Sequence, residues 1–91
     1  MIRLNVFIQV SDDNRAALVA TAKELVEASL KDEGCVAYDF FASTTRADVF
    51  MICETWIDQP ALDAHSATAE FAKFVGEMQK CGKLKLEKFE F

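Results

Sequence analysis

The chain contains one histidine, His65, and its place in the sequence suggests acid–base chemistry. His65 follows Leu62 by three residues and Ala61 by four, so on a helix it lies on the apolar face and points inward. An imidazole can take a proton from an acidic substrate hydroxyl at neutral pH. A helix-face histidine bonded to a backbone carbonyl gives the same pattern, so a structural role is the alternative.

Three other polar side chains stand in segments with strand-like alternation: Asn5, Tyr38 and Glu54. We expect Asn5 and Glu54 to lie in neighbouring strands, where polar groups can line the floor of a pocket. Each also has a structural explanation, because Glu54 can pair with Lys or Arg across the sheet or an interface and Asn5 can bond a backbone group. Tyr38 can equally pack at an interface.

Aromatic residues in the second half of the chain could form pocket walls. Trp56 ends a strand-like segment just before a helix, where its ring could cover a planar ligand, although a core position explains it as well. Phe71 begins an apolar stripe with i, i+3, i+4, i+7 spacing that predicts the core face of a helix: Phe71, Phe74, Val75 and Met78. Phe71 could still line a cavity.

The sequence carries no motif for a metal or an organic cofactor. Its three glycines are too scattered for a phosphate-binding loop. One histidine with three widely spaced cysteines does not make a zinc site, and an odd cysteine count without a C-x-x-C pair does not indicate a disulfide framework. We therefore expect neither metal nor cofactor.

Composition places the chain among small folded domains. Its 91 residues form a single domain, 1–91, and 52% hydrophobic residues exclude a disordered segment. A net charge of −5 makes nucleic acid an unfavourable partner. The N-terminal residues show no leader pattern, and no apolar run approaches the roughly 18 residues that span a bilayer. We expect a cytoplasmic protein that does not bind membranes.

Hydrophobic periodicity sets the expected elements. Alternation predicts strands over residues 2–10, 35–42 and 83–91. A run that is apolar on both sides predicts a central strand, covered on both faces, over residues 49–56. Helical spacing predicts a helix that starts at the capping oxygens of 11–14 and ends at Gly34, and then a short helix over 59–67 and a longer one over 68–82. Asp58 and Thr68 are the start signals of the two later helices.

The order β-α-β-β-α-β predicts an α+β, ferredoxin-like split βαβ fold, with a four-stranded antiparallel sheet and the helices on one face. Both phases of the first three strands are apolar, so the second face also needs cover. We predict a homodimer packed through the sheet faces. In the last strand, Leu84 and Leu86 lie on one phase and Phe89 and Phe91 on the other. This switch predicts a bulge, or a strand end that leaves its sheet for the partner and holds the dimer.

One segment resembles the signature of the antibiotic biosynthesis monooxygenase (ABM) family, E-x-W-x-D/N-x-x-A-L-x-x-H followed by Thr or Ser and Phe. It reads Glu54-Thr-Trp56-Ile-Asp58-Gln-Pro-Ala-Leu62-Asp-Ala-His65, then Thr68 and Phe71. Glu33-Gly34-Cys35 with Tyr38 is similar to the family's E-G-C/N-x-x-Y/F segment. The resemblance extends over essentially the whole chain.

The resemblance implies a dimeric α/β barrel built from two ferredoxin-like sheets, with a pocket between sheet and helices in each subunit. Similar members include cofactor-independent oxygenases of phenols and quinols, isomerases of a phosphorylated signalling sugar, and haem-degrading enzymes. The haem-degrading branch is disfavoured, because its tryptophan falls at His65 and its haem-ligating histidine at Val75.

The function that the resemblance implies is a cofactor-independent monooxygenase that oxidises an aromatic phenol or quinol with O2. His65 would act as base or hydrogen-bond partner, and Asn5 would donate to the developing oxyanion. Walls and substrate contacts would come from Trp56, Phe41, Phe71, Tyr38 and Glu54. Two alternatives remain: a sugar-phosphate isomerase, for which we see no convincing basic cluster, and a non-catalytic dimeric module that binds a small molecule.

Overall fold

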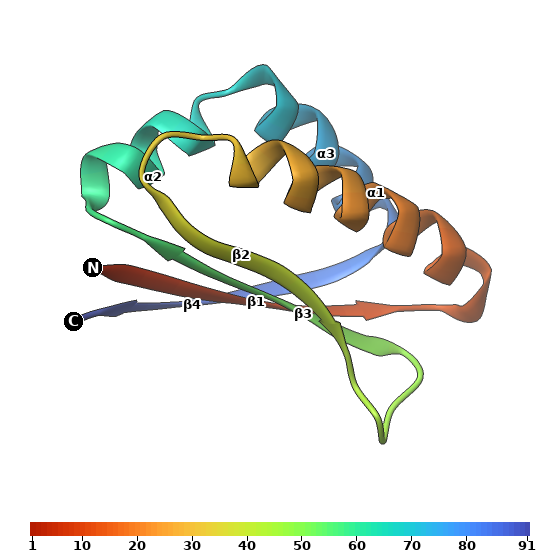
Figure 1. Cartoon of the computed structure of the whole chain (residues 1–91). Helices are drawn as coiled ribbons and strands as arrows, with labels where there is room; N and C mark the ends of the chain where they lie inside the picture. Colours follow the sequence, from red (N-terminus) through yellow and green to blue (C-terminus); the bar gives the residue numbers. More distant parts are fainter.

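The computed structural model describes all 91 residues and contains four strands and three helices. In chain order they are β1 (Ile2–Val10), α1 (Asp12–Leu30), β2 (Cys35–Ala42), β3 (Val49–Trp56), α2 (Gln59–Ser66), α3 (Ala69–Cys81) and β4 (Gly82–Glu90). The helices form one layer over a single face of the sheet, and both termini lie at the same end of it (Figure 1). None of the helices combines the length and apolar composition that crossing a membrane requires.

The sheet has the strand order β2-β3-β1-β4, and every neighbouring pair is antiparallel. This is the ferredoxin-like arrangement, so the predicted fold is confirmed. The two helices predicted after β3 are both present, as α2 and α3, and each begins next to its start signal. Asp58 Oδ1 accepts from the Ala61 N–H and Thr68 Oγ1 from the Phe71 N–H, so each cap satisfies a free N–H at the start of its helix.

The ends of α1 differ from the prediction. Ser11 occupies the N-cap position, but its side chain makes no capping hydrogen bond. The helix ends at Leu30 instead of Gly34, and a turn connects it to β2. Gly34 serves that turn, because its φ of 82° lies in the left-handed region that favours glycine.

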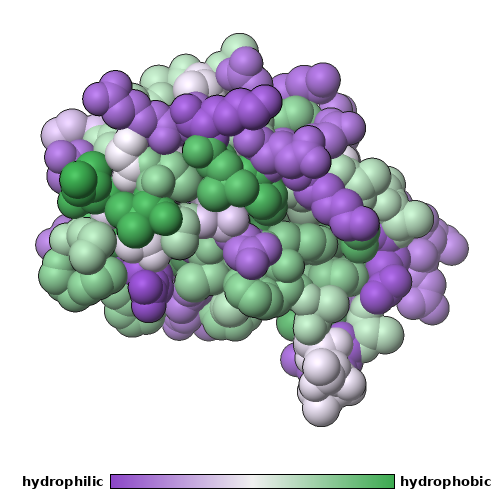
Figure 2. Space-filling model, in the orientation of Figure 1, coloured by the Kyte–Doolittle hydropathy of each residue, from purple (hydrophilic) through white to green (hydrophobic).

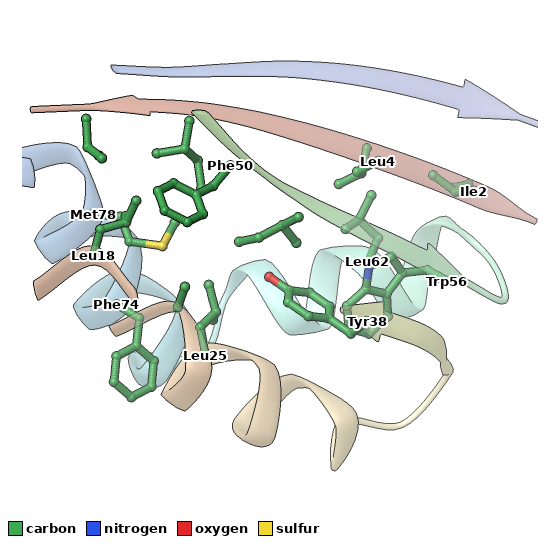
Figure 3. Close-up of a cluster of buried hydrophobic side chains, with 14 residues drawn as sticks. Ile2, Leu4, Leu18, Leu25, Tyr38, Phe50, Trp56, Leu62, Phe74 and Met78 are labelled. Carbon is green, nitrogen blue, oxygen red and sulfur yellow. The ribbon is translucent and has the colours of Figure 1, made fainter. Parts of the chain in front are cut away.

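The hydrophobic core fills the space between the sheet and the helices. Alternation along β1 sends its aliphatic side chains toward the helices, where they meet Leu18 and Leu25 of α1 and Phe74 and Met78 of α3. Figure 3 shows the cluster from Phe50 and Met78 at one end to Trp56, Tyr38 and Leu62 at the other. This second end carries the polar groups of the site.

Two strands depart from the simple alternation that the sequence suggested. A register shift between Cys35 and Ala37 at the start of β2 leaves Val36 exposed, so it does not share the buried face with Tyr38. In β4 neither predicted explanation is right, because the strand stays paired with β1 from Gly82 to Glu90 without a register shift. Leu84 and Phe89 simply face opposite sides of a regular strand.

The outer face of the sheet, opposite the helices, has no cover in a single chain. Its exposed aromatic side chains are Phe7, Phe41 and Phe89, with Phe91 just beyond the end of β4. In Figure 2 the hydrophilic side chains gather over the helical layer, whereas hydrophobic ones lie over the sheet below it. The expectation of two apolar sheet faces is met along β3, which sends Val49, Met51 and Cys53 to the outer face. Along β1 it is met only at Phe7, because the other outer-face side chains are polar: Arg3, Asn5 and Gln9.

Candidate active site

A cavity of about 310 Å³ lies between the sheet and the helices. Eleven of its 16 lining residues are hydrophobic, among them Leu4 and Ile52 from the sheet and Leu25 and Met78 from the helices. Its volume falls at the lower end of the range typical for small-molecule sites. Such walls favour an apolar, flat ligand, so the few polar side chains that reach the cavity decide its chemistry.

Glu54 brings a carboxylate to the cavity wall. It lies near the C-terminal end of β3, on the helix-facing side, and is only 4% exposed. Trp56 Nε1, two residues along the same strand face, donates a hydrogen bond to Glu54 Oε1 at 2.9 Å. Burial raises the pKa of Glu54, and Trp56, His65 and Tyr38 offset that rise in part. The result is an oriented carboxylate that is a stronger base than an exposed one.

Tyr38 lies directly beside Glu54, its cross-strand partner in β2, and also lines the cavity. Burial and, second, the negative charge of Glu54 raise the pKa of Tyr38 far above its ordinary value. The phenol therefore keeps its proton at neutral pH and acts as a hydrogen-bond donor. Tyr38 and Glu54 together offer a donor and a proton acceptor side by side.

The raised pKa of Glu54 predicts a pH-dependent contribution to stability. The folded state holds this proton to higher pH than the unfolded chain does, so stability from Glu54 is fully present below the ordinary glutamate pKa and is lost as the pH rises through the folded pKa. We expect Glu54→Gln to gain free energy of unfolding relative to wild type as the pH rises above the ordinary glutamate pKa of about 4.3, measured by urea denaturation. Glu24→Gln, on the exposed side of α1, is the control. A difference between wild type and Glu54→Gln that stays constant with pH would contradict the raised pKa.

His65 lies on the inner face of α2 and is 2% exposed. Its Nδ1 is 2.8 Å from Asp32 Oδ2 in the turn after α1, whereas Nε2 is buried and has no hydrogen-bond partner. Because an ionised carboxylate can only accept, Nδ1 carries the proton and Nε2 keeps its lone pair in the neutral ring. His65 is thus bonded to a side chain, not to the backbone carbonyl considered above, and it holds one unused basic nitrogen.

Three aromatic rings surround the imidazole. The ring centroid of His65 lies 4.4 Å from that of Trp56, 5.1 Å from Phe71 and 5.8 Å from Tyr38. Tyr38 and Phe71 line the cavity, but His65 and Trp56 do not. The histidine therefore stands one layer behind the cavity wall, and Glu54 and Tyr38 are the polar groups in front of it.

Asn5 and Phe41 do not reach this site, which corrects the expectation that they share its pocket. Asn5 stands between Leu4 and Val6, both of which line the cavity, so the alternation of β1 places it on the outer face. Phe41, opposite Met51, is 47% exposed on the same outer face. The sequence showed that both belong to strands, but the assignment of their phase to the pocket was wrong.

Sequence reasoning missed Asp32, the partner of His65. It lies 33 residues before the histidine in an irregular turn, where periodicity carries no signal. The available signal was Gly34, since a glycine between a helix and a strand often marks a sharp turn, and the structure gives it the left-handed φ of such a turn. That turn packs against α2 and presents Asp32 to the histidine.

The assembled groups support proton transfer on a ligand held in an apolar cavity. Glu54 can accept a proton, Tyr38 can donate a hydrogen bond to the resulting anion, and the Asp32–His65 pair can balance charge behind them. No three His, Cys, Asp or Glu side chains converge as a metal site would require.

Comparison with known proteins places this chain in a family. The model of the family described as antibiotic biosynthesis monooxygenase matches residues 1–77. A Bacillus subtilis protein named "Putative monooxygenase YcnE" is 34% identical over 77 residues, which are 85% of this chain and 81% of YcnE.

Solved structures show the same fold. A Bacteroides thetaiotaomicron protein, described as a conserved protein of unknown function and "Possible Oxidoreductase", is 58% identical, with a TM-score of 0.97 over 99% of this chain and 96% of its own. SnoaB, a cofactor-independent oxygenase from Streptomyces nogalater, has a TM-score of 0.90 at 11% identity, over 99% of this chain and 91% of SnoaB. At that identity the likeness to SnoaB concerns the fold alone. The family match and the similarity to YcnE together establish that this chain belongs to the antibiotic biosynthesis monooxygenase family.

Proposed function

We propose that this chain is a cofactor-independent monooxygenase that oxidises a phenol or quinol-like aromatic molecule with O2. The observation that carries the proposal is the pairing of a buried carboxylate of raised pKa, Glu54, with a protonated phenol, Tyr38, on the wall of an otherwise apolar cavity. The relation to the "Putative monooxygenase YcnE" supports the oxidative assignment.

The protein's first task is to make an electron-rich anion. Glu54 takes the proton of the substrate hydroxyl, and the Tyr38 hydroxyl donates a hydrogen bond to the phenolate oxygen that forms. His65 acts from behind: when its free Nε2 takes up a proton, the positive ring stabilises the carboxylate of Glu54, in keeping with its lowering effect on the pKa of Glu54. Trp56 holds the carboxylate in one orientation through its N–H. The apolar walls exclude water from the anion.

The second task is to keep the anion and O2 together. For a substrate with an activated CH2 group, the anion gives one electron to O2, and the radical pair combines to form a C–O bond. The hydroperoxide then loses water as the remaining C–H proton leaves, so CH2 and O2 become C=O and H2O. The substrate carbon loses four electrons and the two oxygen atoms gain them, so the substrate is the only reductant that the reaction requires.

Oxygen uptake tests this function. Purified protein, freed of metal by chelation and checked spectroscopically for flavin, is mixed with a panel of anthrones and quinols in an oxygen electrode, and ¹⁸O2 labels the product. We expect uptake above the rate with heat-inactivated protein, and one labelled oxygen atom in a ketone product.

Other outcomes would replace the proposal. A rearranged product formed without oxygen uptake would indicate an isomerase, for which the same pair, Glu54 and Tyr38, could move a proton between carbon atoms. A bound panel member recovered unchanged after incubation in air would indicate a binding module.

We also propose that two copies pack through the outer faces of their sheets, with Phe89 and Phe91 in the interface. Both side chains are about half exposed on a face that a single chain leaves uncovered. Removing both rings with Phe89→Ala/Phe91→Ala should raise the dimer dissociation constant about tenfold or more, measured by sedimentation. Leu30→Ala removes a similarly exposed apolar side chain from α1 and should leave the constant unchanged. Equal dimer dissociation constants for wild type, the double variant and Leu30→Ala would argue against this interface.

A further inference from the structure

Four residues form one row across the floor of the cavity. Strand pairing places Tyr38 opposite Glu54, Glu54 opposite Leu4, and Leu4 opposite Lys88. All four face the helices and line the cavity. Glu54 and Lys88 are separated by one strand, so their backbones stand about 10 Å apart, two interstrand spacings. The proposed reacting pair and Lys88 thus start from opposite ends of one row on the sheet.

Lys88 is held at the mouth of the cavity. Its Nζ donates to Gln59 Oε1 at 2.6 Å, and Gln59 Nε2 donates in turn to Asp63 Oδ1 at 2.7 Å. The second bond fixes the amide so that its oxygen faces the lysine. Glu90 lies 3.8 Å from Nζ, but its side chain is 74% exposed, so it is a weak competitor in water. An ammonium group has three donors, and the neighbouring side chains leave capacity for a further acceptor.

Lys88 is the one cation among the residues that line the cavity. It also lies beyond residues 1–77, the part of the chain that the family model matches, so family membership assigns it no role. The other charged side chains of the lining are the carboxylates of Glu54 and Asp63, so Lys88 is the group there that favours an anionic substituent on the ligand.

We infer that Lys88 binds a carboxylate of the substrate, which is an aromatic acid with its hydroxyl and carboxylate at opposite ends of the ring system. The hydroxyl lies at Glu54 and Tyr38, the rings lie over Leu4, and the carboxylate meets Lys88 at the mouth. The orientation of the hydroxyl rests on the proposed function, whereas the carboxylate site rests only on Lys88 and its supports. The backbones of Glu54 and Lys88 stand about 10 Å apart, which matches the length of a fused ring system better than that of a single ring.

Calorimetric titration with three naphthalene probes tests the carboxylate site. 6-Hydroxy-2-naphthoate carries the two groups at opposite ends, 3-hydroxy-2-naphthoate carries them on adjacent carbons, and 2-naphthol lacks the carboxylate. We expect wild type to bind the first probe about tenfold more tightly than either of the others, as one charge-assisted hydrogen bond allows. Equal affinity for 6-hydroxy-2-naphthoate and 2-naphthol would overturn the proposal.

Variants identify the residue. Lys88→Met should remove the preference for 6-hydroxy-2-naphthoate and leave the affinity for 2-naphthol unchanged, whereas Lys88→Arg should retain the preference. Lys80→Met makes the same charge change on the exposed side of α3 and should behave as wild type. A preference that survives Lys88→Met would overturn the assignment. This titration measures binding and does not depend on oxygen uptake. A lack of oxygen uptake would therefore remove the proposed oxidation and leave the carboxylate site intact.

Discussion

Glu54→Gln should lower the turnover number for oxygen uptake by about 10²–10⁴-fold, the usual contribution of a general base. The substitution preserves the size of the side chain, and the amide oxygen can still accept the hydrogen bond from Trp56 Nε1. What it removes is the ability to take a proton. Because the apolar walls and Tyr38 remain in place, KM should change much less than the turnover number.

The comparison variants separate a base on the cavity wall from one behind it. Glu24→Gln makes the same chemical change on the surface of α1 and should keep full turnover. His65→Gln should cost less than Glu54→Gln, since the imidazole acts through the carboxylate and does not line the cavity. If His65→Gln abolishes turnover while Glu54→Gln retains it, the histidine is the base and Glu54 only supports it. Full turnover in both variants would remove this acid–base mechanism.

The sequence contained enough to predict the sheet and the inward placement of His65. Period-2 alternation located three strands, a continuous apolar run located β3, and helical spacing put the histidine on the buried side of α2. Glu54 was named as a candidate because polar groups in neighbouring strands can line a pocket floor, and Tyr38 as a substrate contact that the family resemblance implied. The partner of Glu54 was not predictable: Trp56 bonds Glu54 from two residues along the same strand, in place of the Lys or Arg considered.

The remainder of the site depends on contacts that periodicity does not encode. Asn5 and Phe41 lie in correctly predicted strands, but which phase faces the cavity is fixed only when the helices pack. Asp32 meets His65 because a turn brings together residues far apart in the sequence. Lys88 reaches the cavity because β4 stays in register with β1 to its end, where the sequence had suggested a break.

Gly34→Ala should destabilise the fold by about 3 kcal/mol, measured by urea denaturation. The φ of 82° at this position costs an L side chain about 1–2 kcal/mol. A Cβ would also stand 2.4 Å from Ala61 Cβ and 3.0 Å from Ile57 Cγ2, so the turn would have to move away from α2. Relieving an overpacked contact of this kind costs about 1–3 kcal/mol more.

The same displacement should damage the site, which makes Gly34→Ala a test of the Asp32–His65 pair. The Gly34 carbonyl accepts the N–H of Ile57 at 2.9 Å, so this turn is fixed to the segment that leads into α2. Moving it lengthens the 2.8 Å contact between Asp32 and His65 and frees the imidazole to change tautomer. Gly76→Ala is the matched control, because a Cβ there meets nothing within 4 Å and alanine favours the helix. We therefore expect Gly76→Ala to match or exceed wild type in stability and to keep full turnover, with Gly34→Ala losing both. Equal urea midpoints for wild type and Gly34→Ala would show that the turn accommodates a side chain and does not fix Asp32 against the histidine.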